Sequence, residues 1–201
     1  MMKKPKVGIV VFLGTNCEQD TKRACEFFGW DAEFIWQDDI IKKHYDVIFL
    51  PGGFSYGDHI SSGRIAKLSP AVKSLPMGKS LIVGICNGFQ ILCEAKLLPG
   101  ALTDNKNIKF ISKVSEINFP NELINLPIAH HQGNYISENL DESQILMTYK
   151  NKENGSDSSI AGIYDKENKI IGMMPHPERA IYDELGLTDG RKVFKFFENQ
   201  I

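Results

Sequence analysis

The sequence predicts an α/β protein: a mostly parallel sheet flanked by helices, with a β-rich C-terminal half. Two observations favour this fold class. Continuous apolar runs at 7–13 and 81–85, typical of parallel strands buried on both faces, alternate with helical patterns. After Pro99-Gly100 the helical patterns become rare and short apolar segments follow one another. Strands that alternate with helices imply parallel pairing with right-handed crossovers, whereas consecutive strands allow antiparallel pairs.

The N-terminal half contains the alternating elements. The segment 31–36 alternates polar and apolar residues as a strand does, and Pro51-Gly52-Gly53 ends the strand before it. Asn16 is placed to cap the first helix and Gly29 to end it. In chain order we expect a strand at 7–13, a helix at 17–28, strands at 31–36 and 46–50, a helix at 60–75, a strand at 81–85 and a helix at 89–96.

Strands dominate the C-terminal half, where we expect some antiparallel pairs. The expected elements are strands at 108–118, 144–149, 160–164 and 169–174, a polar loop at 151–159 and a last helix at 189–199. Phe194, Phe196 and Phe197 lie in that helix, and we expect them to pack in the core.

Length and composition indicate one domain, residues 1–201. With 42% hydrophobic and 24% charged residues, the chain has the balance of a globular protein that needs no disulfide or metal for stability. A net charge of -2 indicates neither a nucleic-acid nor a membrane surface. The apolar run at 7–13 is too short for a membrane span and lacks a signal-peptide cleavage site. The four cysteines match no zinc or Cys-x-x-Cys spacing, which favours free thiols in a reducing cytoplasm.

The most informative motif is Gly84-Ile85-Cys86-Asn87-Gly88. It has the spacing of the G-x-S-x-G nucleophile elbow, with sulfur in place of oxygen, between an expected strand and an expected helix. Such a turn strains the backbone and presents the thiol at a helix N-terminus, whose partial positive charge favours the thiolate. A buried cysteine that ends a core strand is the alternative. The glycine spacing favours Cys86 as a nucleophile.

A thiol nucleophile needs a base and a group that orients the base. Among five histidines, His176 differs because Pro175 and Pro177 restrict the backbone on both sides. Glu178 lies two residues on, where in an extended segment its carboxylate points to the side of His176 and can fix the tautomer. A proline-rich surface turn with an ordinary glutamate is the alternative. Because both motifs follow expected parallel strands, we predict a Cys86–His176–Glu178 triad.

Acyl transfer also needs donors for an oxyanion. The backbone N–H of Asn87, directly after the nucleophile, is one candidate. The loop Pro51-Gly52-Gly53 offers a second, because glycine lets an N–H approach a substrate closely; a turn that only ends a strand is the alternative. The chain has no P-loop, no dinucleotide fingerprint and no cluster with metal-ligand spacing, so we expect no cofactor and no metal in it.

Three segments together resemble a known family. They are the elbow Gly-Ile-Cys-Asn-Gly-Phe-Gln (84–90), the loop Pro-Gly-Gly-Phe-Ser-Tyr-Gly-Asp (51–58) and the tail Met-Pro-His-Pro-Glu-Arg-Ala (174–180). The chain is similar to the class I, triad-type glutamine amidotransferases and, more narrowly, resembles the glutaminase subunits of phosphoribosylformylglycinamidine synthase. The resemblance covers nearly the whole chain in order and implies an amidotransferase-like, flavodoxin-like fold.

The resemblance implies that Cys86 attacks the side-chain carboxamide of glutamine, with His176 as base and acid and Glu178 as the orienting carboxylate. The substrate-binding residues that it implies are Gly52, Gly53, Phe54, Asn87, Gln90, Asn134 and Tyr135. It also implies a synthetase subunit, which uses ATP and Mg²⁺ to amidate formylglycinamide ribonucleotide with the released ammonia, together with a small third subunit. His131 and Gln132 depart from the family pattern, in which a glycine and an acidic residue follow the first histidine, and leave the details of that loop open.

Two other classes of protein stay open at this point. One is a free-standing thiol amidase or γ-glutamyl hydrolase, which should turn over without a partner. The other is a non-catalytic binding module or a redox-sensing thiol protein of the same fold. The intact set of Cys86, His176 and Glu178 disfavours the second class.

Overall fold

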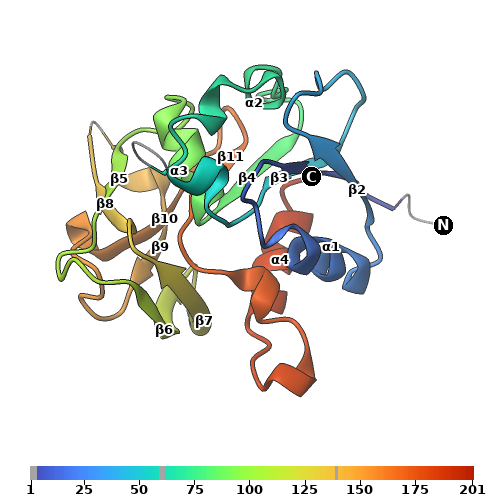
Figure 1. Ribbon diagram of the computed structural model, residues 1–201. Helices are drawn as coiled ribbons and strands as arrows, with labels where there is room; N and C mark the ends of the chain where they lie inside the picture. The colour runs from blue at the N-terminus through green and yellow to red at the C-terminus, as the bar shows by residue number, and fades with distance from the viewer. Residues whose placement is uncertain (1–3, 59–61, 139) are drawn as a thin grey trace.

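The computed structural model describes residues 4–58, 62–138 and 140–201 (Figure 1). Within these residues a nine-stranded sheet runs in the order β2 (Asp31–Trp36), β1 (Lys6–Val11), β3 (Val47–Leu50), β4 (Leu81–Ile85), β11 (Ile170–Met173), β10 (Ile160–Asp165), β9 (Ile145–Tyr149), β6 (Ile111–Phe119) and β7 (Glu122–His130). The strands from β2 to β11 pair in parallel, and from β10 on every pair is antiparallel. The predicted α/β fold with a β-rich C-terminal half is confirmed.

Helices cover both faces of the sheet. In the described residues they are α1 (Glu18–Phe27), α2 (Pro70–Lys73), α3 (Asn87–Glu94) and α4 (Gly190–Glu198). In Figure 1, α1 and α4 lie on one side of the sheet and α2 and α3 on the other. Phe194 and Phe197 of α4 are fully buried and Phe196 packs against the core, as predicted. Along the described chain, no helix combines the length and apolar character needed to cross a membrane.

The ends of α1 confirm one capping prediction and correct another. Cys17, not Asn16, is the N-cap residue, because its carbonyl oxygen accepts the N–H of Thr21 (3.0 Å), the first hydrogen bond of the helix. Gly29 ends the helix as predicted, with a φ of 72°. Its N–H donates to the carbonyl of Glu26 (2.9 Å), which is half of a Schellman motif that the next residue completes.

The prediction of a helix at 60–75 is wrong over residues 62–75. Residues 60 and 61 lie outside the described residues. The chain forms a 3₁₀ turn, η2 (Ala66–Leu68), and then the short helix α2. Pro70 is the cause, because it forces Ser69 into an extended conformation (φ -63°, ψ 148°) and so interrupts any helix there. Ser69 then caps α2 by accepting the N–H of Val72 (3.2 Å).

Three observed strands are absent from the sequence prediction: β7, β5 (Ala101–Thr103) and β8 (Asn134–Ile136). β7 contains Pro127, which argues against a central strand but is tolerated here because β7 is the edge of the sheet. The carbonyl oxygen of Pro127 accepts the N–H of His176 (2.8 Å), so this edge strand reaches the predicted site. The strand expected at 108–118 begins only at Ile111.

Candidate active site

Cys86 lies at a sharp turn between β4 and α3, with a φ of 51° and a ψ of -104°. A positive φ is strained for a residue with a Cβ and is typical of functional turns. A Cβ on Gly88 would lie 1.8 Å from the Leu50 carbonyl oxygen, and one on Gly84 would lie 2.6 Å from Leu92 Cδ1. The predicted strand–turn–helix geometry is confirmed, and only glycine fits at these two positions.

His176 and Glu178 follow β11, which pairs in parallel with β4 and so leaves the sheet at the same edge as the elbow. His176 Nδ1 donates to Glu178 Oε1 at 2.7 Å, and each residue is 2% exposed. The segment that carries Glu178 is a 3₁₀ turn, η5 (Pro177–Arg179), rather than the extended chain expected from the sequence. The predicted contact between carboxylate and imidazole is nevertheless present.

The Cys86 thiol and the His176 ring face the same space beside Gly52. A Cβ on Gly52 would lie 2.8 Å from His176 Cε1 and 3.5 Å from Cys86 Cβ. Cys86 Sγ donates a long hydrogen bond (3.6 Å) to the Ala129 carbonyl oxygen, and His176 Nε2 has no hydrogen-bond partner among the described residues. His176 Nε2 is therefore free to exchange a proton with the thiol.

Opposing effects act on the imidazole of His176. Burial disfavours the charged ring, whereas the Glu178 carboxylate and a thiolate at Cys86 favour it, and together they hold the pKa of His176 well above its usual value. The pair therefore stabilises a protonated ring, the form that gives a proton to a leaving group.

The predicted glycine loop packs on the segment that follows β1. The N–H of Phe54 donates to the Gly14 carbonyl oxygen (2.9 Å), and the N–H of Cys17 to that of Gly52 (3.2 Å). A Cβ on Gly53 would lie 2.7 Å from the Gly14 oxygen, so the meeting of two loops requires glycine there. The Phe54 side chain is exposed.

Asn87 and Gln90 link the elbow to two loops. The Asn87 side chain accepts the N–H of Ser55 (3.2 Å) and donates to Gln90 Oε1 (2.8 Å). Gln90 donates in turn to the Gln132 carbonyl oxygen (2.7 Å). Asn87 is the first residue of α3, where a backbone N–H has no acceptor inside the helix. Both residues thus lie next to the elbow, and their contact with substrate stays a prediction.

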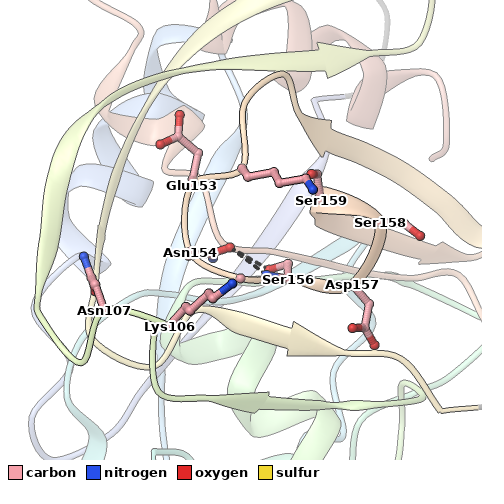
Figure 2. A pocket seen from close by; sticks show the side chains of 10 residues that line it. Lys106, Asn107, Glu153, Asn154, Ser156, Asp157, Ser158 and Ser159 are labelled. Atoms are coloured by element: carbon pink, nitrogen blue, oxygen red, sulfur yellow. Dashed lines mark hydrogen bonds between the residues drawn. The ribbon is translucent and has the colours of Figure 1, made fainter.

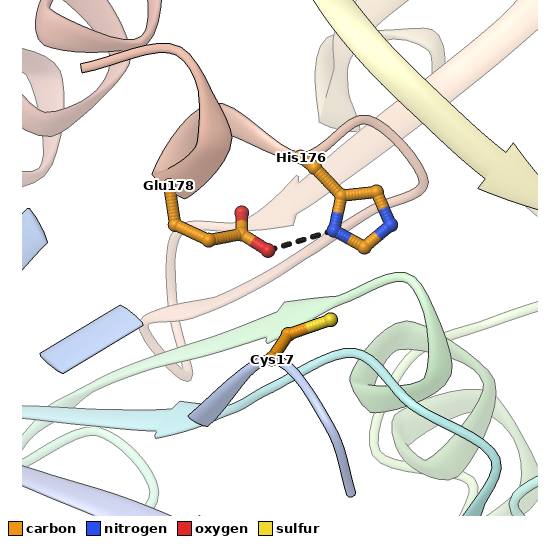
Figure 3. Close-up of side chains that lie close together, drawn as sticks. All are labelled: Cys17, His176 and Glu178. Atoms are coloured by element: carbon orange, nitrogen blue, oxygen red, sulfur yellow. Dashed lines mark hydrogen bonds and ion pairs between the residues drawn. The ribbon is translucent and has the colours of Figure 1, made fainter. Parts of the chain in front are cut away.

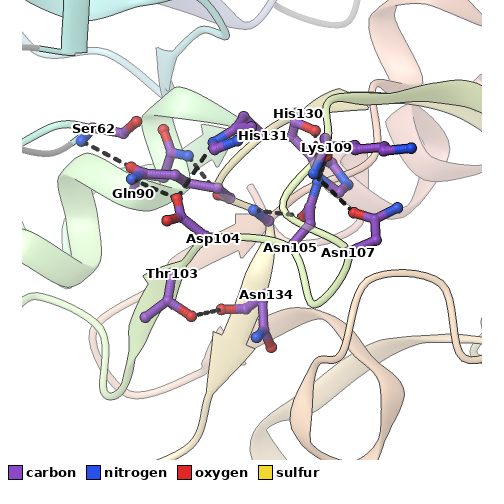
Figure 4. A network of polar contacts seen from close by, with 12 residues as sticks. Ser62, Gln90, Thr103, Asp104, Asn105, Asn107, Lys109, His130, His131 and Asn134 are labelled. Atoms are coloured by element: carbon purple, nitrogen blue, oxygen red, sulfur yellow. Dashed lines mark hydrogen bonds and ion pairs between the residues drawn. The ribbon is translucent and has the colours of Figure 1, made fainter.

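His131 and Gln132, the two departures from the family pattern, share one acidic partner. His131 Nδ1 lies 3.3 Å from Asp104 Oδ1, and Gln132 Nε2 donates to the same oxygen at 3.0 Å (Figure 4). Gln132 Oε1 also accepts the N–H of Ser62 (3.2 Å). These contacts hold the loop after β7 against the segments that carry Asp104 and Ser62.

His130 is buried at the end of β7, just before this loop. Its Nδ1 lies 3.0 Å from Asn105 Oδ1, an oxygen that also accepts the N–H of Gly133 (3.2 Å). Burial, assisted by the charge of His176, lowers the pKa of His130 to about 4. A neutral histidine therefore lies within reach of the charge of His176 in the predicted triad.

Asn134 and Tyr135 lie on β8. Tyr135 is fully buried, its ring stacks on Phe89 of α3 with 5.6 Å between centroids, and its hydroxyl donates to the Pro99 carbonyl oxygen (2.9 Å). The Asn134 carbonyl oxygen accepts from the Thr103 hydroxyl (3.3 Å). The structure gives Tyr135 a packing contact behind the elbow helix, and substrate contact by either residue stays a prediction.

Sequence reasoning missed Cys17. Its sulfur, a nitrogen of His176 and an oxygen of Glu178 lie within 4.8 Å of one another (Figure 3). Arg179, which follows Glu178, donates from Nη2 to Cys17 Sγ at 2.9 Å. One sequence signal could have found Cys17: it follows the first parallel strand, at the edge where such a sheet holds its site.

Cys17, His176 and Glu178 are also residue types that bind zinc. The Arg179 guanidinium beside the sulfur disfavours a second cation there, because like charges repel strongly in a buried place. The Nδ1 proton of His176 is already donated to Glu178. The donor set therefore fits an acid–base pair better than a metal centre.

A cavity of about 640 Å³ lies apart from the triad, along the polar loop expected at 151–159 (Figure 2). Its lining residues are Lys106, Asn107, Lys152, Glu153, Asn154, Gly155, Ser156, Asp157, Ser158 and Ser159. Asn154 Nδ2 and Ser156 Oγ both donate to the Gly133 carbonyl oxygen, at 2.5 Å and 3.3 Å. The cavity wall thus supports the loop after β7 and includes none of the predicted site residues.

Fold and site together define the class of this protein, the glutamine amidotransferases. The family model of the CobB/CobQ-like glutamine amidotransferase domain matches residues 4–145 and 129–186. Two PurQ subunits of phosphoribosylformylglycinamidine synthase are similar over most of their length. The one from Helicobacter hepaticus is 44% identical over 92% of this chain and 93% of its own, and the one from Alkaliphilus metalliredigens 43% over 94% of each. The chain belongs to this PurQ family.

Solved structures agree with this assignment. A chain in the structure of PurLQS from Thermotoga maritima matches with a TM-score of 0.90 and 39% identity, over 98% of this chain and 99% of that one. A putative GMP synthase protein from Thermoplasma acidophilum matches with a TM-score of 0.68 at 18% identity, over 100% of this chain and 95% of that one. This second likeness shows the shared fold alone.

Proposed function

We propose that this chain is the glutaminase subunit of phosphoribosylformylglycinamidine synthase, in de novo purine biosynthesis. It hydrolyses glutamine to glutamate and ammonia, and the ammonia serves a synthetase subunit. The observation that carries the mechanism is the strained Cys86 beside the buried His176–Glu178 pair. Similarity to synthase subunits over nearly the whole chain favours this function over a free-standing hydrolase or a binding module.

In the first half-reaction, Cys86 Sγ attacks the side-chain carbonyl carbon of glutamine. The oxyanion accepts hydrogen bonds from the backbone N–H groups of Gly53 and Asn87, and the first turn of α3 favours negative charge there. The raised pKa of His176 keeps on the ring the proton that departing ammonia needs. Cleavage of the C–N bond leaves a γ-glutamyl thioester on Cys86.

In the second half-reaction, neutral His176 takes a proton from water, which attacks the thioester carbon. The C–S bond breaks, glutamate leaves and Cys86 is restored. Glu178 keeps the Nδ1 position protonated throughout, so proton exchange takes place at Nε2. Gly52 leaves room between sulfur and ring for the carboxamide, because it has no side chain.

The ammonia is consumed outside this chain. The related chain from Thermotoga maritima is part of PurLQS, and we infer that this chain assembles with PurL and PurS in the same way. ATP and Mg²⁺ would bind the synthetase partner, and this chain would need no cofactor of its own. Four free thiols support a cytoplasmic location, and one core cluster from β1 to α4 supports a single domain over 1–201.

Replacing Cys86 with alanine tests this assignment in the assembled complex. Cys86→Ala is expected to lower glutamine-dependent amidation at least about 10³-fold, because it removes the sulfur that forms the thioester. Ammonia-dependent amidation by the partner should be unchanged. Cys93→Ala, at a buried cysteine of α3, is the matched control and should keep both activities. Glutamate release by Cys86→Ala at a rate near that of the wild type would place the nucleophile elsewhere.

A further inference from the structure

Cys17 joins parts of the site that are distant in the sequence. Its backbone N–H donates to the Gly52 carbonyl oxygen (3.2 Å), which ties it to the glycine loop. Its thiol donates to Asn16 Oδ1 (3.1 Å) and its sulfur accepts from Arg179 Nη2 (2.9 Å). Cys17 is 1% exposed and lies against the His176 ring, so water cannot replace these contacts.

We propose that Cys17 and Arg179 are positioning residues of the glutaminase: the Cys17 thiol anchors the Arg179 guanidinium beside the His176–Glu178 pair, and that charge sets the orientation and basicity of the imidazole. This inference rests on the proposed function, because the base in question acts in glutamine hydrolysis. Glu178 Oε2 is buried without a hydrogen-bond partner in the described part of the chain. This oxygen is therefore left to interact with nearby charge, and Arg179 is a cation whose charge interacts with that of Glu178.

A neutral thiol suits the task of an anchor. Burial raises the pKa of Cys17 and outweighs the nearby His176 ring, which lowers it. At neutral pH the S–H group can therefore donate to Asn16 while its sulfur accepts from Arg179. On Arg179, burial is outweighed by the interactions with Cys17, Glu178 and Asp20, which raise its pKa and keep it cationic.

The anchored guanidinium and the His176 ring both interact with the charge of the Glu178 carboxylate, which raises the pKa of His176 and also that of Arg179. Because a positive charge near an imidazole disfavours its protonated form, we expect the anchored guanidinium to offset part of the rise that Glu178 causes. Arg179 has a second partner in Asp20 of α1, at 3.4 Å. Without the Cys17 anchor it can move toward Asp20, and Glu178 then acts on His176 alone. The pKa of His176 rises further, and the neutral ring that activates water becomes scarce.

Each element packed around His176 contributes its own titratable groups. They are Glu178 on its own segment, Cys86 from the elbow, His130 from β7, and Cys17 and Asp20 from α1, with Arg179 between them. Helix α4 meets η5 through Gly190, which carries no charge. Substituting Cys17 or Arg179 therefore removes none of the triad side chains and leaves the His130 side chain unchanged.

The test is the pH dependence of glutamate release by the assembled complex. Cys17→Ala and Arg179→Gln are each expected to lower kcat about tenfold to a hundredfold with little change in KM, because the base is misplaced and not the substrate. In both variants, the limb of the pH–rate profile that reports the ionisation of the imidazole should shift to higher pH by about one unit. Cys17→Ser, which keeps a donor and an acceptor, should restore most of the rate and the wild-type limb.

Cys25→Ala is the matched control: it removes the same side chain from a buried place further along α1, away from the triad, and should keep the wild-type profile. Ammonia-dependent amidation reports that each complex has assembled. A wild-type rate and pH profile in both Cys17→Ala and Arg179→Gln would overturn the proposal, as would the same shift in Cys25→Ala. Absence of glutamine turnover in the wild-type complex would instead contradict the proposed function.

Discussion

At the scale of residues, two positions of the site require glycine because a side chain there would collide with a neighbouring segment. A side chain at Gly52 would meet the His176 ring, and one at Gly88 would meet the Leu50 carbonyl oxygen. The motif spacing predicts that glycine is needed at position 88, and the sequence offers Gly52 as part of a loop that can approach a substrate. Neither observation can name the atoms in question, which belong to other segments. Gly52 therefore shapes the space for substrate, whereas Gly88 sets the distance between helix and strand.

The lowered pKa of His130 predicts that the protein loses stability in mild acid. Its pKa is about 4 when folded and near 6.5 when unfolded, so between these values the unfolded chain binds more protons. As the pH falls from 6.5 to 5, this residue should lower the free energy of unfolding by about 1.4 kcal/mol per pH unit. The raised pKa of His176 acts in the other direction only above pH 6.5, so it does not mask the slope.

Urea unfolding at several pH values measures this slope. His130→Gln, a neutral side chain that can still bond to Asn105, should remove it. His44→Gln, at an exposed histidine, is the control and should leave it as in the wild type. A His130→Gln variant that keeps the full slope would show that other groups cause the acid sensitivity.

At the scale of elements, a strand or helix is predicted correctly where residues close together in the chain carry the pattern that predicts it. The bounds of β2 and β4 are predicted to the residue, because alternation or continuous apolar residues mark the whole strand. β7 is not predicted, since Pro127 contradicts the local pattern and only its place at the sheet edge makes the strand possible. The predicted helix at 60–75 fails at Pro70 for a reason that is itself local.

The packing of α3 on β3 gives a prediction for Gly88→Ala. Alanine favours an isolated helix by about 1 kcal/mol over glycine. Here its Cβ would lie 1.8 Å from the Leu50 oxygen, so α3 must move away from β3. We expect a net loss of roughly 2 to 3 kcal/mol in the free energy of unfolding. Alkylation of Cys86 by a reactive glutamine analogue should also slow down.

Gly29→Ala is the control for Gly88→Ala. Its Cβ would meet no atom within 4 Å, and its φ of 72° adds backbone strain alone. We expect a loss of about 1 kcal/mol and no change in alkylation. A Gly88→Ala protein as stable and as reactive as Gly29→Ala would contradict the steric argument.

At the scale of the whole molecule, one pair of strands joins the two halves of the sheet. β4 of the first half pairs in parallel with β11 of the second, in register from Ile82 with Ile170 to Ile85 with Met173. The same pair of strands brings the elbow and the His176–Glu178 segment to one edge of the sheet. Folding of the sheet and assembly of the site are therefore coupled.

This pairing of strands predicts a single cooperative unfolding transition. The core is one cluster with residues from β1 to α4, so neither half keeps a complete core alone. Both tryptophans, Trp30 and Trp36, lie in the first half, whereas far-UV circular dichroism reports all strands. The two signals should give the same urea midpoint. Separate midpoints would show that the halves unfold independently and would contradict a single domain.

The sequence by itself determined the fold class, the elbow at Cys86 and the local pair of His176 and Glu178, because each depends on residues close together in the chain. Only the tertiary structure decided that Cys17 and Arg179, 162 residues apart, meet beside that pair. It also decided that β7 forms the sheet edge and that His130 is buried within reach of the charge of His176. These contacts depend on which strands pair and on what fills the space at their ends, and no local pattern encodes either.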